Sequence, residues 1–118
     1  MAPKILICDD EESLRELVRA VLGNRYRYVE ATDGEEALEV ARNDSPELII
    51  LDVMLPRMNG LEVLSELRRD ENHRRTPVIV VTAWSHAAEA ATAAGADIFL
   101  AKPFEPEFLT HAVEELIG

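Results

Sequence analysis

Short apolar segments alternate along this chain with segments of helical periodicity, and this alternation constrains the fold more than any other feature. The apolar segments are typical of strands, and those at residues 4–8 and 47–52 are continuous enough for burial on both faces. Strands are predicted at residues 4–8, 26–31, 47–52, 78–82 and 97–101. Strands joined through helices lie parallel in one sheet, with right-handed crossovers covering both faces. The sequence therefore predicts an α/β fold with a five-stranded parallel sheet between two layers of helices.

Local signals mark where several helices begin and end. Asp33 is a candidate N-cap because Glu36 follows three residues later, and Ser45-Pro46 breaks the helix that starts there. The last two helices are predicted at residues 86–94 and 106–117. In the final helix we expect four apolar side chains to face inward, namely Phe108, Leu109, Val113 and Leu116.

Length and composition limit the class of protein. The 118 residues suit one domain, which we expect to span residues 1–118. No apolar run approaches the roughly 20 residues that a membrane helix needs, and the N-terminus lacks the layout of a signal peptide. The single cysteine, Cys8, excludes a disulfide within the chain and favours a buried thiol and a cytoplasmic location. A formal net charge of −11 argues against sequence-independent binding of nucleic acid.

Polar side chains follow four of the five predicted strands. In an open parallel sheet, ligands bind outside the carboxyl ends of the strands. The polar residues at these ends are Asp9 and Asp10 after the first strand, Asp52 on the third, Thr82 on the fourth and Lys102 after the fifth. We therefore expect all five side chains to lie along one edge of the sheet.

This set of side chains indicates a particular chemistry. Three converging carboxylates raise one another's pKa unless a cation neutralises them. An all-oxygen site suits Mg²⁺, whereas the absence of thiolate and imidazole ligands disfavours zinc. A carboxylate nucleophile, a hard metal, a lysine and a hydroxyl suit phosphoryl transfer. Each residue alone also has a structural explanation, such as helix capping by Asp9-Asp10, so the hypothesis depends on their co-occurrence.

The same residues resemble the signature of a known family, the receiver domains of response regulators in two-component signalling, of which the chemotaxis regulators are examples. The resemblance covers nearly the whole chain and rests on four segments, which are Asp9-Asp10, Asp52-Val53-Met54-Leu55-Pro56-Arg57-Met58-Asn59-Gly60, Thr82-Ala83 and Lys102-Pro103-Phe104. It implies a flavodoxin-like (βα)5 three-layer sandwich with strand order 2-1-3-4-5.

The resemblance also implies a role for each matched residue. Asp52 becomes the phosphoacceptor and Lys102 the cation that binds the phosphoryl group. Asp10 is expected to bind Mg²⁺ directly and Asp9 through water. The backbone carbonyl of Met54 is expected to be the third protein ligand, beside Asp10 and Asp52.

The family's switch is implied at two further positions. Thr82 is expected to supply the switch hydroxyl, and Phe99 stands where the family often has a tyrosine that turns inward on activation. The family also implies a cis Lys102-Pro103 bond.

Two departures from the family concern the surface. The Ala-rich fourth helix looks short, and residues 104–118 contain glutamates but no Lys or Arg to pair with them. For that reason we expect a monomer, with any dimer weak or phosphorylation-dependent.

The function implied is that of a signalling module which catalyses only its own phosphotransfer and dephosphorylation. Its expected partner is a sensor histidine kinase or a histidine phosphotransfer protein, with no direct contact to nucleic acid or membrane. One alternative is a Mg²⁺-dependent phosphohydrolase with an Asp nucleophile, but Met54 stands where such enzymes usually carry a second acid. Another is a receiver-like domain that has lost phosphorylation, which the intact set of polar residues disfavours. A nucleotide-binding function lacks the expected glycine-rich motif after the first strand.

Overall fold

The sheet and its covering helices agree with the predicted class of fold. A computed structural model describes residues 2–118. Its five parallel strands lie in the order β2-β1-β3-β4-β5, as the resemblance implied. The strands are β1 (Lys4–Cys8), β2 (Arg27–Ala31), β3 (Leu48–Leu51), β4 (Val78–Thr82) and β5 (Ile98–Ala101). The helices are α1 (Glu12–Leu22), α2 (Gly34–Asp44), α3 (Gly60–Arg69), α4 (Ala88–Ala94) and α5 (Pro106–Ile117).

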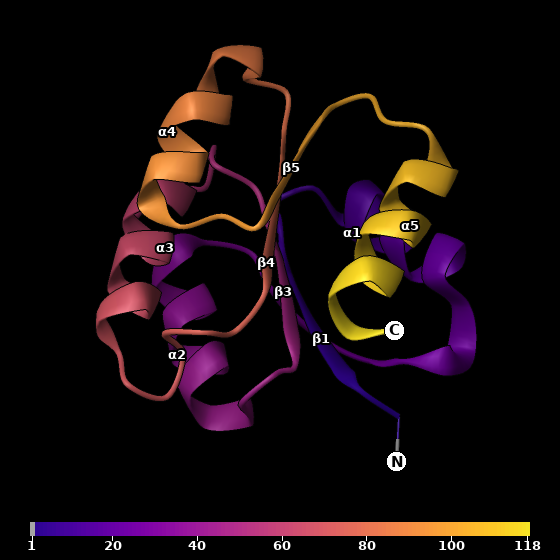
Figure 1. Ribbon diagram of the computed structural model, residues 1–118, viewed down its shortest axis with the longest axis horizontal. Helices are drawn as coiled ribbons and strands as arrows, with labels where there is room; N and C mark the ends of the chain where they lie inside the picture. Colours follow the sequence, from indigo (N-terminus) through magenta and orange to yellow (C-terminus); the bar gives the residue numbers. More distant parts are fainter. Residues whose placement is uncertain (1) are drawn as a thin grey trace.

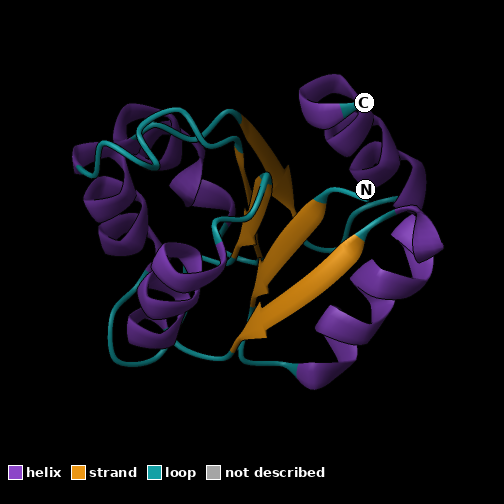
Figure 2. Ribbon diagram, turned by 90° about the horizontal axis from the view of Figure 1, so that it is seen from below, coloured by secondary structure: helices purple, strands orange, loops and turns teal. Residues whose placement is uncertain are grey.

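The helices form two layers, one on each face of the sheet. Helices α2, α3 and α4 cover one face, and α1 and α5 cover the other (Figure 1). Seen from below, the twisted strands separate the two groups of helices (Figure 2). Two apolar clusters correspond to these layers, because successive residues of each strand point to opposite faces. Ile5 and Ile7 pack with the α1–α5 layer, whereas Leu6 packs with the other one.

Helix starts follow the local sequence. The side chain of Asp33 accepts a hydrogen bond from the Glu36 amide at 2.8 Å, so the predicted N-cap of α2 is confirmed. At α3, Asn59 and Glu62 form a reciprocal capping box that the sequence analysis did not anticipate. Helix α4 is only seven residues long and follows a 3₁₀ turn at Ser85–Ala87, so it begins later than predicted.

Helix α5 corrects two expectations. Phe108 does not face inward, because its side chain is 56% exposed. The buried stripe of α5 runs through Leu109, Ala112 and Val113, at the i, i+3, i+4 spacing of one helical face, and Phe108 lies outside that stripe. The glutamates of this helix are also not all unanswered, since Arg25 Nη1 lies 3.5 Å from Glu114 Oε2.

Candidate functional site

Three carboxylates meet at the carboxyl edge of the sheet, where the sequence placed them. Asp9 and Asp10 follow β1, and Asp52 follows the neighbouring strand β3. Asp9 and Asp52 are buried, while Asp10 is exposed to solvent. One carboxylate oxygen from each of the three residues lies within 4.8 Å of the others. The edge therefore holds an acidic cluster that is open to solvent on the side of Asp10.

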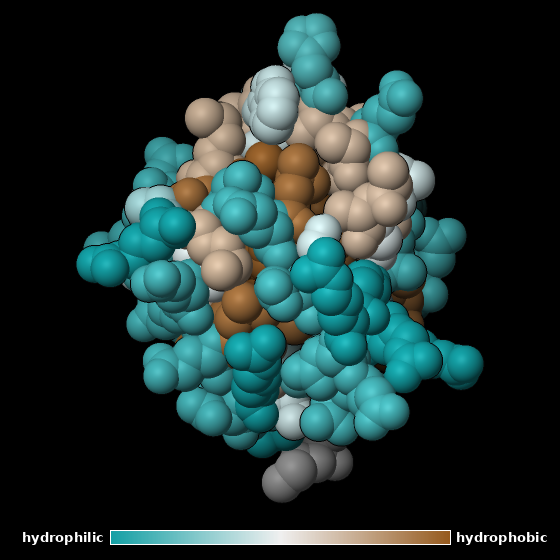
Figure 3. Space-filling model, turned by 90° about the vertical axis from the view of Figure 1, so that its left-hand side faces the viewer, coloured by the Kyte–Doolittle hydropathy of each residue, from teal (hydrophilic) through white to brown (hydrophobic). Residues whose placement is uncertain are grey.

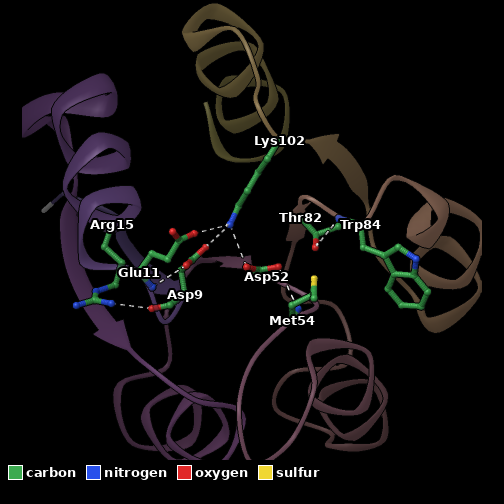
Figure 4. Close-up of polar contacts among 8 residues, drawn as sticks. All are labelled: Asp9, Glu11, Arg15, Asp52, Met54, Thr82, Trp84 and Lys102. Atoms are coloured by element: carbon green, nitrogen blue, oxygen red, sulfur yellow. Dashed lines mark hydrogen bonds and ion pairs between the residues drawn. The ribbon is translucent and has the colours of Figure 1, made fainter.

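Lys102 connects the two buried carboxylates (Figure 4). Its Nζ donates to Asp9 Oδ2 at 2.9 Å and to Asp52 Oδ2 at 3.0 Å. A carboxylate from outside this cluster also approaches the same nitrogen, because Glu11 Oε1 lies 3.7 Å from it. The residue reaches the cluster from the end of β5, where its amide donates to the Thr82 carbonyl and the Lys102-Pro103 bond is cis, as the resemblance implied.

The protonation of this cluster follows from burial and from Lys102. Burial raises the pKa of the Asp9 carboxyl, and the hydrogen bonds from Lys102 and from the Glu11 amide oppose this rise without cancelling it. Burial lowers the pKa of Lys102, but its hydrogen bonds to Asp9 and Asp52 outweigh burial, so the net shift is upward. Lys102 is therefore an ammonium near neutral pH, and its charge partly neutralises the carboxylates.

The ligand atoms available in this cluster fit a hard divalent cation. Carboxylate oxygens dominate the site, and an all-oxygen set is what Mg²⁺ prefers. Cys8 lies next to Asp9 in the chain, but it is buried, and burial raises the pKa of its thiol. The thiol therefore stays protonated and supplies no thiolate for a soft metal. The cluster can hold a metal ion of the magnesium type.

The loop after Asp52 is packed tightly against that residue. The Met54 amide donates to Asp52 Oδ1 at 3.1 Å, and the Gly60 amide donates to the Val53 carbonyl at 2.8 Å. A Cβ on Gly60 would lie only 2.1 Å from the Asp52 carbonyl oxygen, so glycine is required there. Met54 itself is 61% exposed and lines the same groove as Asp10.

The two predicted switch residues are Thr82 and Phe99. Among the described residues, the Thr82 side chain makes no hydrogen bond to the acidic cluster. Thr82 is fully buried, and its Oγ1 accepts a hydrogen bond from the Trp84 amide at 3.3 Å (Figure 4). Phe99 on β5 is partly buried and packs against the apolar core cluster under α2, α3 and α4. It pairs in register with Val80, two residues before Thr82.

An apolar groove adjoins the acidic cluster. It has a volume of ≈ 830 Å³ and lies between the loops that follow β3 and β4. Met54 and Trp84 contribute exposed side chains to it, and Asp10 is shared with the cluster. The space-filling view shows apolar surface on this side of the molecule, which carries α2, α3 and α4 (Figure 3).

The sequence analysis missed two residues that contact Asp9. The Glu11 amide donates to Asp9 Oδ1 at 2.9 Å, and Arg15 Nη1 donates to the Asp9 backbone carbonyl at 2.7 Å. Glu11 directly follows the paired aspartates, so its nearness was readable from the chain. Arg15 gave no such signal, because an arginine on an amphipathic helix is usually solvated.

A parallel sheet of this order, with an acidic cluster and a lysine at its carboxyl edge, defines a particular class of α/β domain. The sequence model of the response regulator receiver domain matches residues 5–114, and the chain belongs to that family. Receiver domains are signalling modules of two-component systems, which generally interact with histidine kinases.

Individual relatives agree with the family. The response regulator MprA of Mycobacterium ulcerans is 41% identical over 121 residues, covering 100% of this chain and 48% of its own length. A putative response regulator from Chloroflexus aurantiacus superposes with a TM-score of 0.93 at 34% identity, covering 98% of both chains. The receiver domain of a sensor histidine kinase from Pseudomonas aeruginosa was solved with a magnesium ion coordinated in its active-site cleft. It superposes with a TM-score of 0.87 at 31% identity, covering 100% of this chain and 99% of that domain.

The chain spans about half the length of the curated relatives that it matches. Among residues 2–118, no helix combines the length and the apolar character needed to cross a bilayer.

Proposed function

We propose that this chain is a phosphoacceptor receiver domain, formed by residues 1–118, which takes a phosphoryl group onto Asp52. The donor is a phosphohistidine of a sensor histidine kinase or of a histidine phosphotransfer protein. The domain acts as a signalling module in the cytoplasm, and its only catalysis is its own phosphorylation and dephosphorylation.

The observation that carries this proposal is the position of Lys102. Its ammonium bridges Asp9 and Asp52 at 2.9 Å and 3.0 Å, at the open edge of the sheet. A lysine held there is placed to bond an oxygen of a phosphoryl group on Asp52. Since phosphoryl transfer depends mainly on positioning and on charge neutralisation, a lysine and a metal beside a carboxylate are the groups that it needs.

The metal in this proposal is Mg²⁺. Asp10 and Asp52 would bind it directly, with the backbone carbonyl of Met54 as a further ligand and Asp9 acting through water. When bound, the ion neutralises charge on the phosphoryl oxygens. The convergence of the three carboxylates within 4.8 Å supports this assignment, as does the magnesium ion in the Pseudomonas aeruginosa relative.

In the transfer step, a carboxylate oxygen of Asp52 attacks the phosphorus atom. The bond from phosphorus to the donor's imidazole nitrogen breaks, and that nitrogen keeps the electron pair. Lys102 exchanges part of its contact with Asp52 for a phosphoryl oxygen. Hydrolysis reverses the modification when water attacks the same phosphorus and Asp52 leaves as a carboxylate.

The proposed output begins at Thr82. Its hydroxyl now accepts from the Trp84 amide, and we expect it to turn and donate to a phosphoryl oxygen instead. That rotation would release the start of the segment leading to α4 and make room for Phe99 to move inward. Thr82 and Phe99 lie on the neighbouring strands β4 and β5, where Phe99 pairs with Val80, so a movement of Thr82 can reach Phe99 through this strand pair.

A small phosphodonor tests the function without a known kinase. The protein is incubated with acetyl phosphate and Mg²⁺, and its intact mass is measured with time. We expect one phosphoryl group in the wild type and none in Asp52→Asn. Asp44→Asn is the matched control, since Asp44 ends α2 and is not part of the acidic cluster. Unchanged labelling of Asp52→Asn would overturn the assignment.

A further inference from the structure

Two arginines of α1, Arg15 and Arg19, contact β2, and Arg15 is the less exposed of them. Its side chain is 12% exposed, compared with 34% for Arg19. Arg15 Nε donates to Glu30 Oε1 at 2.7 Å, and Arg19 pairs with the other oxygen of the same carboxylate. Glu30 on β2 therefore orients both guanidinium groups, but only Arg15 reaches further, to the Asp9 carbonyl (Figure 4).

The contact from Arg15 completes the bonding of Asp9. The Asp9 amide donates to the Ala31 carbonyl at 3.1 Å, and the Asp9 carbonyl accepts from Arg15 Nη1 at 2.7 Å. The carboxylate accepts from the Glu11 amide and from Lys102, each at 2.9 Å. Both polar backbone atoms of Asp9 and both of its carboxylate oxygens are thus engaged, and the peptide between β1 and α1 is held in one orientation.

That peptide carries two of the three carboxylates. Asp9 and Asp10 share the link between β1 and α1, and a rotation of the Asp9 carbonyl would displace both side chains relative to Asp52. Arg15 is the fourth residue of α1, so its bond ties the first turn of the helix to this link across six residues. A loss of this bond frees the link at its carbonyl.

We propose that Arg15 is a positioning residue for the metal, which fixes the Asp9-Asp10 link through the Asp9 carbonyl and so sets the affinity for Mg²⁺. This inference rests on the proposed function, because it takes the acidic cluster to be a magnesium site. Residues that orient metal ligands without touching the ion typically change the affinity about 10- to 100-fold when they are replaced.

Charge and positioning predict opposite signs for the same substitution. Removing a positive charge beside an acidic site strengthens the attraction of a divalent cation, so a purely electrostatic role makes Arg15→Gln bind Mg²⁺ more tightly. Positioning makes the same variant bind less tightly. Arg19→Gln removes the same charge from the same Glu30 network and leaves the Asp9 carbonyl contact in place, so it is the matched control.

The experiment measures Mg²⁺ dissociation constants by calorimetry for the wild type, Arg15→Gln and Arg19→Gln, with circular dichroism to compare their folds. We expect Arg15→Gln to bind about tenfold more weakly, and Arg19→Gln to bind as the wild type or slightly more tightly. In phosphorylation by acetyl phosphate, the defect of Arg15→Gln should appear in the Mg²⁺ half-saturation more than in the maximal rate. If Arg15→Gln does not fold, the pair Arg15→Lys and Arg19→Lys decides, with weaker binding expected only for the first.

Equal or tighter binding by Arg15→Gln overturns the inference and leaves the proposed function standing. Equal weakening by Arg19→Gln also overturns it, because the effect then belongs to the shared Glu30 network. A wild type that binds Mg²⁺ no better than Asp10→Ala instead refutes the magnesium site itself.

Discussion

Replacing Lys102 with methionine tests how the acidic cluster is held together. The substitution keeps most of the apolar stem and removes the ammonium that lies 2.9 Å from Asp9 and 3.0 Å from Asp52. These two side chains are only 4% and 6% exposed, so the variant leaves two buried like charges without their shared partner. Removing one partner of a buried ion pair costs about 3–5 kcal/mol. Because the cluster opens to solvent beside Asp10, we expect a loss at the lower end, about 3 kcal/mol at pH 8 without Mg²⁺.

The loss should depend on pH with a definite sign. In the wild type, burial already raises the pKa of Asp9 and Lys102 opposes that rise, so removing Lys102 raises the folded-state pKa further. When a carboxyl has a higher pKa in the folded state than in the unfolded state, the protein becomes less stable as the pH rises from the unfolded-state pKa through the folded-state pKa. The deficit of Lys102→Met should therefore be smaller at acid pH, where protonation of the buried Asp9 removes its uncompensated charge, and should grow toward pH 8.

Urea unfolding at pH 4.5 and pH 8, with and without Mg²⁺, measures these free energies. Lys4→Met is the matched control, since Lys4 is the only other lysine and its Nζ lies 3.8 Å from a more exposed carboxylate of Asp44. Such a surface pair contributes at most about 1 kcal/mol. A Lys102→Met variant as stable as the wild type at pH 8, or one equally destabilised at both pH values, would refute the reasoning.

Three further predictions concern the metal, the assembly and the tryptophan. Asp10→Ala should stabilise the metal-free domain by roughly 0.5–1 kcal/mol and remove most of the rise in melting temperature that Mg²⁺ gives the wild type, and thermal melting with and without the ion checks both. The exposed glutamates of α5 should keep the unphosphorylated protein monomeric at micromolar concentration, and a tight dimer in light scattering at low salt would contradict this. Trp84 emission should change on Mg²⁺ binding and again on phosphorylation, with the second change absent from Asp52→Asn. Trp84→Ala should shorten the lifetime of the phosphorylated state by opening a path for water, and an unchanged lifetime in a hydrolysis assay would leave Trp84 as ordinary packing.

The sheet and the meeting of its polar ends were predictable because they depend on backbone periodicity. A run such as residues 47–52 is buried on both faces wherever its neighbours pack, and a parallel sheet necessarily brings Asp9, Asp52 and Lys102 to one edge. The strand order came from the family resemblance and not from periodicity, since the alternation of strands and helices alone permits more than one order.

Contacts of long side chains were not predictable in the same way. The bond from Arg15 to the Asp9 carbonyl depends on how α1 docks against β1 and β2, which no local pattern encodes. Phe108 was misplaced for a related reason: it is adjacent to Leu109, and only the packed helix shows which of two neighbouring apolar residues faces the sheet. The hydrogen bond between the Trp84 amide and Thr82 Oγ1 is likewise a property of the folded loop.

Transfer from a phosphorylated histidine donor tests the central claim most directly. A histidine kinase or phosphotransfer protein carrying labelled phosphohistidine is mixed with this protein and Mg²⁺, and the label on both proteins is followed together with its stability in acid. We predict that label lost from the donor appears on the wild type as an acid-labile acyl phosphate, and that Asp52→Asn receives none. Stoichiometric acid-stable label on a serine or threonine, or undiminished transfer to Asp52→Asn, would contradict the account.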